Sequence, residues 1–209
     1  MEFWKMSPWQ VFCAGGPLMW PIFICSIMSL AIILERFFVL SHSKINAQSL
    51  LNKIIEYVKH NRIKEALEEC EKKSSPVSRI LKAGIIKYDR TKDQMKESIE
   101  DASLYEIPIL EKRMTALATI AHISPLLGLL GTVTGMVGAF QAIHKVGISG
   151  PVSPADLAAG IWEALLTTVF GLMVAIPTYV FYNILVSKIN SIVLDMERTA
   201  TELVNFLSE

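Results

Sequence analysis

The sequence predicts an all-α polytopic membrane protein whose three transmembrane helices extend into a helical cytoplasmic domain. Three long tracts lead to this fold class: Met6–Leu34 and Met114–His144 contain no charged residue, and Leu157–Ser187 contains only Glu163. Each tract exceeds the roughly 20 apolar residues that a helix needs to cross a bilayer. The composition agrees, because 52% of the 209 residues are hydrophobic, 19% are charged, and the mean hydropathy is +0.41.

The first tract is typical of a retained helix and not of a cleaved signal peptide. Its hydrophobic part, "PLMWPIFICSIMSLAIIL", is too long for the apolar region of a signal peptide, and it lacks a small-residue cleavage site and a basic segment in front. Three tryptophans suit one headgroup interface: Trp4, Trp9 and Trp20. Glu35 and Arg36 mark the opposite interface, where we expect them to snorkel and to pair at the helix end.

The stretch between the first two tracts is predicted to be helical throughout. Apolar residues at helical spacing cover 50–67, with a break near Asn61. The segment "TKDQ" at 91–94 fits a capping box. We therefore expect a long helix to start there and to run through Arg113 into the second tract, with a kink at Pro108.

The chain after the third tract carries an apolar seam with alternating spacings of four and three residues, which is typical of helices that pack lengthwise. The seam consists of Leu185, Ile189, Ile192, Met196, Thr199, Leu203 and Phe206. We therefore expect the third membrane helix to extend well into the cytoplasm. In front of that helix, Ser153 is expected to cap it and Pro154 to take its first position.

Basic residues set the predicted orientation. Fifteen Lys and Arg lie in the loop that ends at Arg113, against Lys145 alone in the connector after the second tract, so the positive-inside rule places the long loop in the cytoplasm. The predicted segments are the outside residues 1–14, a first transmembrane helix 15–40, a cytoplasmic domain 41–113, a second transmembrane helix 114–144, an outside connector 145–156, a third transmembrane helix 157–187 and a cytoplasmic tail 188–209.

Small residues recur every three or four positions in the second and third tracts, a pattern that lets helix backbones approach closely. They are Gly128, Gly131, Gly135 and Gly138 in the second tract, and Gly160, Ala164, Thr168, Gly171 and Ala175 in the third. Two such faces offer more packing than one chain can use, which favours a homo-oligomer with the faces between subunits. Pro125 and Pro177 are expected to kink their helices.

Glu163 is the most informative residue of the third tract. It lies about 15 Å inside the outer end of the helix, counted from Ser153, and no basic residue lies in any of the three tracts. An acidic residue in a membrane helix costs on the order of 3 kcal/mol or more and usually marks an ion path or a polar assembly interface. Both roles stay open for Glu163. The nearby threonines likewise either line a path or bond their own backbone as packing residues: Thr132, Thr134, Thr167 and Thr168.

Soluble-enzyme signatures are absent from the sequence. It contains no Walker A segment, no H-E-x-x-H, no G-x-S-x-G and no Cys-x-x-Cys pair. We therefore expect no enzymatic activity, no cofactor and no metal. The formal net charge is zero, so nothing indicates nucleic-acid binding.

The segments "ISPLLGLLGTVTGMVGAF" and "GIWEALLTTVFGLMVAIP" strongly resemble the paired signature segments of the MotA/TolQ/ExbB proton channel family, and most closely its TolQ/ExbB branch. The first helix and the three-helix topology match as well, so the resemblance covers almost the whole chain. It implies that Thr132, Glu163 and Thr168 occupy the family's ion-path positions. Thr167 departs from the pattern, since relatives often carry alanine there.

The resemblance also implies partners and a location. The expected assembly is a pentamer in the bacterial inner membrane around an ExbD- or TolR-like single-span protein with a membrane aspartate, which passes work to a TonB- or TolA-like protein. A structural scaffold without ion conduction and a MotA-like stator stay open as alternatives, although the three tracts disfavour the four-helix stator. The transported ion, H⁺ or Na⁺, is left open.

Overall fold

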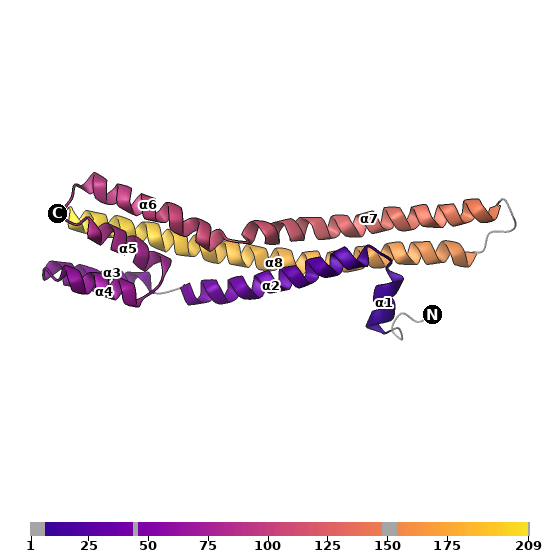
Figure 1. Cartoon of the computed structure of the whole chain (residues 1–209), viewed down its shortest axis with the longest axis horizontal. Helices are drawn as coiled ribbons and strands as arrows, with labels where there is room; N and C mark the ends of the chain where they lie inside the picture. Colours follow the sequence, from indigo (N-terminus) through magenta and orange to yellow (C-terminus); the bar gives the residue numbers. More distant parts are fainter. Residues whose placement is uncertain (1–6, 44–45, 148–153, 209) are drawn as a thin grey trace. The chain divides into compact units, whose positions relative to one another are not determined.

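The computed structural model of the chain describes residues 7–43, 46–147 and 154–208, which form eight α-helices and no strand (Figure 1). The chain divides into two compact units, and each combines parts that are distant in sequence. One unit comprises residues 1–34 with 115–182, and the other comprises residues 35–114 with 183–209. Three stretches are long and apolar enough to cross a membrane, which confirms the predicted all-α fold with three membrane helices.

The first unit contains α1 (Pro8–Ala14), the first part of α2 (Met19–Ser43), nearly all of α7 (Met114–Gly147) and the first part of α8 (Pro154–Leu207). A capping box starts α1: the Ser7 hydroxyl accepts from the Gln10 N–H at 3.3 Å, and the Gln10 side chain accepts from the Ser7 N–H at 3.0 Å. The predicted cap of α8 at Ser153 lies outside the described residues.

Aromatic rings tie α1 to the start of α2. The Phe12 ring stacks on Trp9, with ring centres 5.7 Å apart, and meets Trp20 edge-on at 5.3 Å. Trp9 and Trp20 stay 64% and 55% exposed, as rings at a headgroup interface would. Trp4, the third tryptophan of that prediction, lies outside the described residues.

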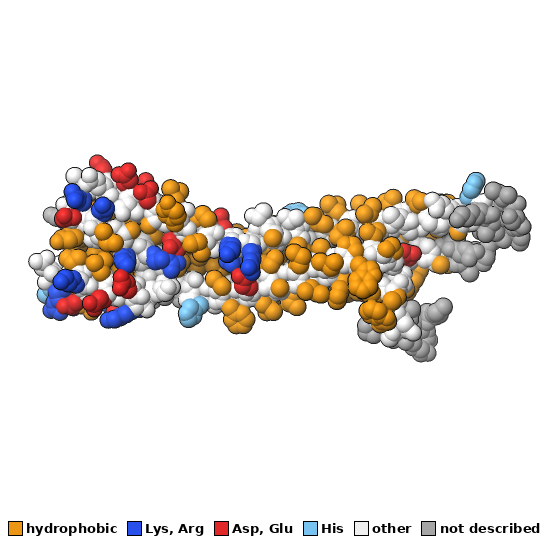
Figure 2. Space-filling model, viewed as in Figure 1, with side chains coloured by type: hydrophobic (Ala, Val, Ile, Leu, Met, Phe, Trp, Pro, Cys, Tyr) orange, Lys and Arg blue, Asp and Glu red, His pale blue; other side chains and the backbone are white. Residues whose placement is uncertain are grey.

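The apolar helices leave most of their side chains uncovered. In the most apolar windows of the three candidate spans, only 28%, 22% and 33% of the residues are buried within the chain. Figure 2 shows hydrophobic side chains spread over these helices, while Lys, Arg, Asp and Glu gather mostly over the helices between residues 47 and 111. Such a surface needs lipid or further protein to cover it, because contiguous apolar patches of this size do not persist in water.

The second unit contains the end of α2, then α3 (Ala47–Lys59), α4 (Ile63–Lys72), α5 (Pro76–Ile86), α6 (Lys92–Glu111) and the end of α8. The break predicted near Asn61 is confirmed: this residue has φ 56° and separates α3 from α4. Fully buried aliphatic side chains from several helices make the core: Leu50, Leu51, Ile54, Ile80, Leu81, Ile85 and Leu203.

The seam predicted on α8 is confirmed. Six of its seven members are at most 4% exposed, from Leu185 through Leu203. The seventh, Phe206, is half-buried with the Lys59 ammonium 5.6 Å from its ring centre. The helix runs without a break for 54 residues, about 80 Å, so the membrane tract and the tail form one element, as expected.

The predicted continuous helix from Thr91 through Arg113 into the second tract is wrong. The Thr91 hydroxyl does accept from the Gln94 N–H at 3.4 Å and starts α6. However, α6 passes through Pro108 and ends at Glu111, and α7 starts afresh at Met114. Between them Lys112 has ψ 132°, outside the helical range, and Arg113 has φ 64°, a left-handed conformation that no continuous helix contains.

Contacts from α2 explain why the chain breaks there. The Arg36 guanidinium donates to the carbonyl oxygen of Ile109 at 3.3 Å, which satisfies a carbonyl in the last turn of α6. Glu35 pairs with Arg36 at 3.1 Å and also with Arg113. The predicted pairing at the helix end is therefore present. The predicted snorkelling of Arg36 is wrong, because this residue is only 4% exposed and its guanidinium binds the end of α6.

Candidate functional site

The small-residue faces of α7 and α8 pack against each other within one chain. A methyl group built on Gly128 would lie 3.0 Å from the backbone of Thr167 and of Thr168, and one built on Gly171 would lie 2.6 Å from the carbonyl oxygen of Ser124. Real Cβ atoms essentially never come as close as 2.6 Å, and a 3.0 Å approach is tighter than nine in ten of their contacts. These glycines therefore set how near the two helices can come.

The two helices pack as closely at Gly135 of α7 and at Gly160 of α8. A methyl group on Gly135 would lie 2.9 Å from the Gly160 carbonyl oxygen, and one on Gly160 would lie 2.8 Å from the Cβ of Ala139. Gly138 differs, since nothing lies within 4 Å of a methyl group built there. We expected these faces between subunits, whereas in the structure five of the six glycines contact the facing helix of the same chain.

Thr167 fills the space that Gly131 leaves. A methyl group on Gly131 would lie 2.1 Å from the Thr167 hydroxyl oxygen and 2.4 Å from its Cβ. Thr167 is 1% exposed, and its hydroxyl donates to the Ala164 carbonyl oxygen at 2.8 Å. This threonine is therefore a packing residue in the middle of the α7–α8 interface.

Thr168 links the two helices by a hydrogen bond. Its hydroxyl lies 3.2 Å from the Gly128 carbonyl oxygen on α7 and 3.4 Å from the Ala164 carbonyl oxygen on its own helix. Thr132 lies four residues after Gly128 and so on the same face of α7. It is half-buried, and its hydroxyl donates to the Leu129 carbonyl oxygen at 2.6 Å. Thr168 therefore contacts α7 one turn before Thr132, while the Thr132 hydroxyl bonds only its own helix.

Glu163 faces a different neighbour from Thr168. Its carboxylate lies against Gly16, where a methyl group would lie 1.8 Å from the Glu163 Oε1. Gly16 has φ 71°, a conformation that only glycine adopts readily, in the turn between α1 and α2. Glu163 is half-buried, and among the described residues its carboxylate makes neither a hydrogen bond nor an ion pair. In the part of the chain that the structure describes, this carboxylate thus lies against the Gly16 backbone with no cation beside it.

Sequence reasoning missed three members of this region. Gly16 could have been found from the "GGP" turn signal at residues 15–17. Ser124 and Thr178 are at most 2% exposed and bond carbonyl oxygens of their own helices at 2.8 and 2.7 Å; no sequence pattern distinguishes them from other hydroxyls. Pro125 and Pro177 lie inside α7 and α8, which continue through them.

A metal site finds no support in the part of the chain that the structure describes, where no three His, Cys, Asp or Glu side chains come together. The arrangement offers hydroxyls, carbonyl oxygens and one carboxylate along a tight pair of apolar helices. Those groups can pass or bind a small cation.

Comparison with known proteins identifies the family. The model of the MotA/TolQ/ExbB proton channel family matches residues 72–198, a stretch that includes Thr132, Glu163 and Thr168. The chain belongs to this family. It matches the TolQ of Haemophilus influenzae at 30% identity over 87% of this chain and 83% of that protein. An ExbB-like biopolymer transport protein of Synechocystis is 30% identical over 82% and 81% of the two chains. The ExbB of Aquifex aeolicus is 37% identical over 56% and 76%.

The matches place the chain in the TolQ/ExbB branch of the MotA/TolQ/ExbB family. Relatives with both names align over most of their own length, and the three apolar spans agree with a membrane protein of the TolQ/ExbB type. Gly16, which covers Glu163, lies outside the part that the family model matches.

Proposed function

We propose that this chain is the ion-conducting subunit of a TolQ/ExbB-type motor, which converts proton motive force into work on a periplasmic or outer-membrane partner. One charge that moves down a membrane potential yields about 2.3 kcal/mol per 100 mV. Using that energy requires a narrow polar path in a tightly packed helical assembly. The α7–α8 pair supplies close packing through its glycines, and Thr132 and Thr168 supply polar groups on the same pair.

The observation that carries the proposal is the state of Glu163. A carboxylate in an otherwise charge-free tract, with no cation beside it in the described residues, is costly and marks a functional position. Its neighbour among the described residues is the backbone of Gly16, which carries no charge. The competing function, a scaffold, is favoured by one finding: Thr132, Thr167 and Thr168 all bond carbonyl oxygens within the chain.

The assembly and the orientation belong to the same proposal. We place residues 1–14 and 145–156 outside and residues 41–113 and 188–209 in the cytoplasm, with membrane helices over 15–40, 114–144 and 157–187. Apolar surface on α2, α7 and α8 is available to further copies, to a total of five, and to an ExbD- or TolR-like partner with a membrane aspartate. That partner would engage a TonB- or TolA-like protein.

Reconstitution separates the motor from the scaffold. Purified from its native membrane, the chain should bring with it a small single-span protein that carries a membrane aspartate. Vesicles that contain both proteins should acidify when a potassium gradient and valinomycin set an inside-negative potential, whereas vesicles with this chain alone should not. A complex that assembles with its partner and conducts neither H⁺ nor Na⁺ would favour the scaffold.

Thiol labelling tests the proposed orientation. In a background with Cys13→Ser and Cys25→Ser, Ser149→Cys should react with a membrane-impermeant maleimide in intact cells, and Ser74→Cys only after permeabilisation. Ser74 is exposed, while Ser149 lies outside the described residues. Cys70 can stay, because it is buried and burial raises the pKa of its thiol to about 12. The reverse labelling pattern would overturn the orientation.

A further inference from the structure

The inner boundaries of the apolar tracts meet at one level in the second unit. Glu35, the first charged residue after the first tract, pairs with Arg113, the last one before the second tract. Lys188 is the first charged residue after Glu163 on α8, and its ammonium lies 4.1 Å from the ring centre of Phe37. Three apolar tracts therefore become polar side by side, where a bilayer changes from acyl chains to headgroups.

A cavity of about 380 Å³ lies between α2 and α8 just beyond this level. Its lining consists of Leu40, Ser41, Ser187, Lys188, Ser191 and Ile192. The floor is apolar, since Leu40 and Ile192 are 1% and 4% exposed. The walls carry three hydroxyls and one ammonium, and no acidic side chain lines the cavity.

The hydroxyls of this cavity are not used by the helices that carry them. Elsewhere in the apolar helices, Ser29 and Ser124 bond a backbone carbonyl oxygen of the preceding turn at 2.9 and 2.8 Å. Within the described residues, the exposed side-chain hydroxyls of Ser41, Ser187 and Ser191 make no hydrogen bond to the protein. Three free donors beside a cation fit a phosphate group, whose oxygens accept several hydrogen bonds.

An aromatic pair on α2, one turn before Ser41, suits an acyl chain, and its Phe37 ring lies beside the Lys188 ammonium. Phe37 and Phe38 stand edge to face, with ring centres 6.4 Å apart, and are 43% and 71% exposed. They follow the apolar face of α2, while the polar walls lie one turn further on. A ligand that fits both parts has an anionic head and an apolar tail.

We infer that this cavity binds the phosphate headgroup of an anionic phospholipid, with Lys188 and the three serines as its donors and the Phe37–Phe38 pair against its acyl chains. Basic pockets between helices on the cytoplasmic side are typical sites for anionic headgroups. The inference requires that the chain spans a membrane, and the cytoplasmic location of the cavity rests on the proposed orientation. It is therefore independent of ion conduction, and either proposal can fail without the other.

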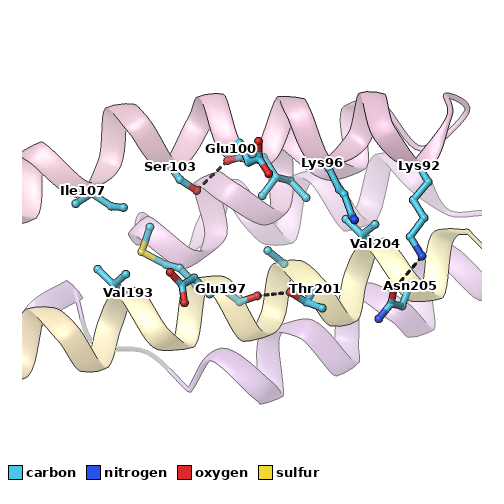
Figure 3. Close-up of a pocket in the computed structure, with 13 residues that line it drawn as sticks. Lys92, Lys96, Glu100, Ser103, Ile107, Val193, Glu197, Thr201, Val204 and Asn205 are labelled. Atoms are coloured by element: carbon cyan, nitrogen blue, oxygen red, sulfur yellow. Dashed lines mark hydrogen bonds between the residues drawn. The ribbon is translucent and has the colours of Figure 1, made fainter.

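A larger groove in the same unit lacks this character. It has a volume of about 460 Å³ between α6 and α8 (Figure 3). Lys92 and Lys96 line it together with Glu100 and Glu197, and Lys92 already donates to Asn205 at 3.1 Å. Because acidic and basic side chains both line this groove and Lys92 is already hydrogen-bonded, the groove has no preference for an anion.

Native mass spectrometry tests the inference on the intact complex released from nanodiscs that contain equal phosphatidylglycerol and phosphatidylcholine. The wild-type complex should retain more phosphatidylglycerol than phosphatidylcholine. Lys188→Gln should lower that preference about fivefold, the effect of one basic residue at a membrane surface. Ser187→Ala with Ser191→Ala should lower it less, and Lys188→Arg should keep it.

Two control variants separate this site from general charge effects. Lys112→Gln removes an exposed charge beside Arg113 but outside the cavity, and Lys59→Gln removes a cation from the Phe206 ring. Both should keep the preference. An equal loss in Lys112→Gln and Lys188→Gln, or no loss in Lys188→Gln, would overturn the site. Displacement of the lipid by millimolar inorganic phosphate would assign the cavity to free phosphate and overturn the lipid assignment.

Discussion

Glu163→Ala is expected to abolish energy-dependent function while the complex still inserts and binds its partner. The carboxylate is the only charged group of its tract, and no cation neutralises it among the described residues. Alanine removes the group that an ion would meet. Ion flux in reconstituted vesicles should fall to the rate of protein-free vesicles, and complementation of a strain that lacks the gene should fail.

Glu163→Gln separates charge from shape. Glutamine has the size of glutamate, so it should keep the fit against Gly16, where there is no room for a side chain, and still lose flux. Thr132→Ala and Thr168→Ala should lower flux, while Thr167→Ala should be mild because its hydroxyl bonds only its own helix. Thr134→Ala serves as the control, since Thr134 is exposed and bonds the Leu130 carbonyl oxygen of its own helix.

Two results would return Glu163 to a packing role. Full flux in Glu163→Ala would show that no ion depends on the carboxylate. Loss of flux together with loss of the partner in a pull-down would show that Glu163 holds the assembly. Wild-type partner binding without flux, in both Glu163→Ala and Glu163→Gln, is the expected pattern.

The second large effect concerns Gly131 at the α7–α8 interface. Gly131→Ala should destabilise the chain by about 1–3 kcal/mol, the usual cost of overpacking, because the new Cβ would lie 2.1 Å from the Thr167 hydroxyl oxygen. Gly131→Leu should prevent the helices from docking and so break the complex. Unfolding in detergent–SDS mixtures, followed by tryptophan fluorescence, measures the first effect, and light scattering measures the second.

The structure predicts which second substitution restores the stability of the Gly131→Ala variant. Thr167→Ala should not, because the Cβ of residue 167 remains 2.4 Å from the new methyl group. Thr167→Gly should, at the cost of roughly 1 kcal/mol for glycine in a helix. Gly138→Ala is the control and should be neutral or stabilising, since nothing lies within 4 Å of its Cβ position. Equal destabilisation by Gly131→Ala and Gly138→Ala would contradict the packing.

Much of the fold follows from local patterns in the sequence. Charge-free tracts mark the membrane helices because lipid excludes charges. The α8 seam from Leu185 is also readable, since a helix shows its buried side by its spacing. Each of these two patterns can be recognised within a single continuous stretch of the sequence. The break near Asn61 was likewise visible, as a gap in the apolar spacing.

The features that could not be predicted from the sequence depend on contacts between residues that are distant in the chain. At the break, Arg36 binds the Ile109 carbonyl oxygen that a continuous helix would bond to a backbone N–H, and Glu35 pairs with the Arg113 side chain. Both partners lie more than 70 residues earlier in the chain. A sequence contains no local sign of that exchange. The glycines of α7 were recognised as a close-packing face, but the sequence does not say that the same chain's α8 covers it. Gly16 beside Glu163 is hidden for the same reason.

The α7–α8 glycines differ in how they can change over evolutionary time. At Gly131 the obstacle is a side chain, so a substitution there becomes acceptable once position 167 has lost its Cβ. At Gly135, Gly160 and Gly171 the obstacle includes a carbonyl oxygen of the facing helix, which every amino acid possesses. No substitution of a facing side chain removes the carbonyl oxygen at these three positions. Gly131 can therefore be replaced when position 167 changes with it. Gly135, Gly160 and Gly171 are constrained by the backbone of the opposite helix.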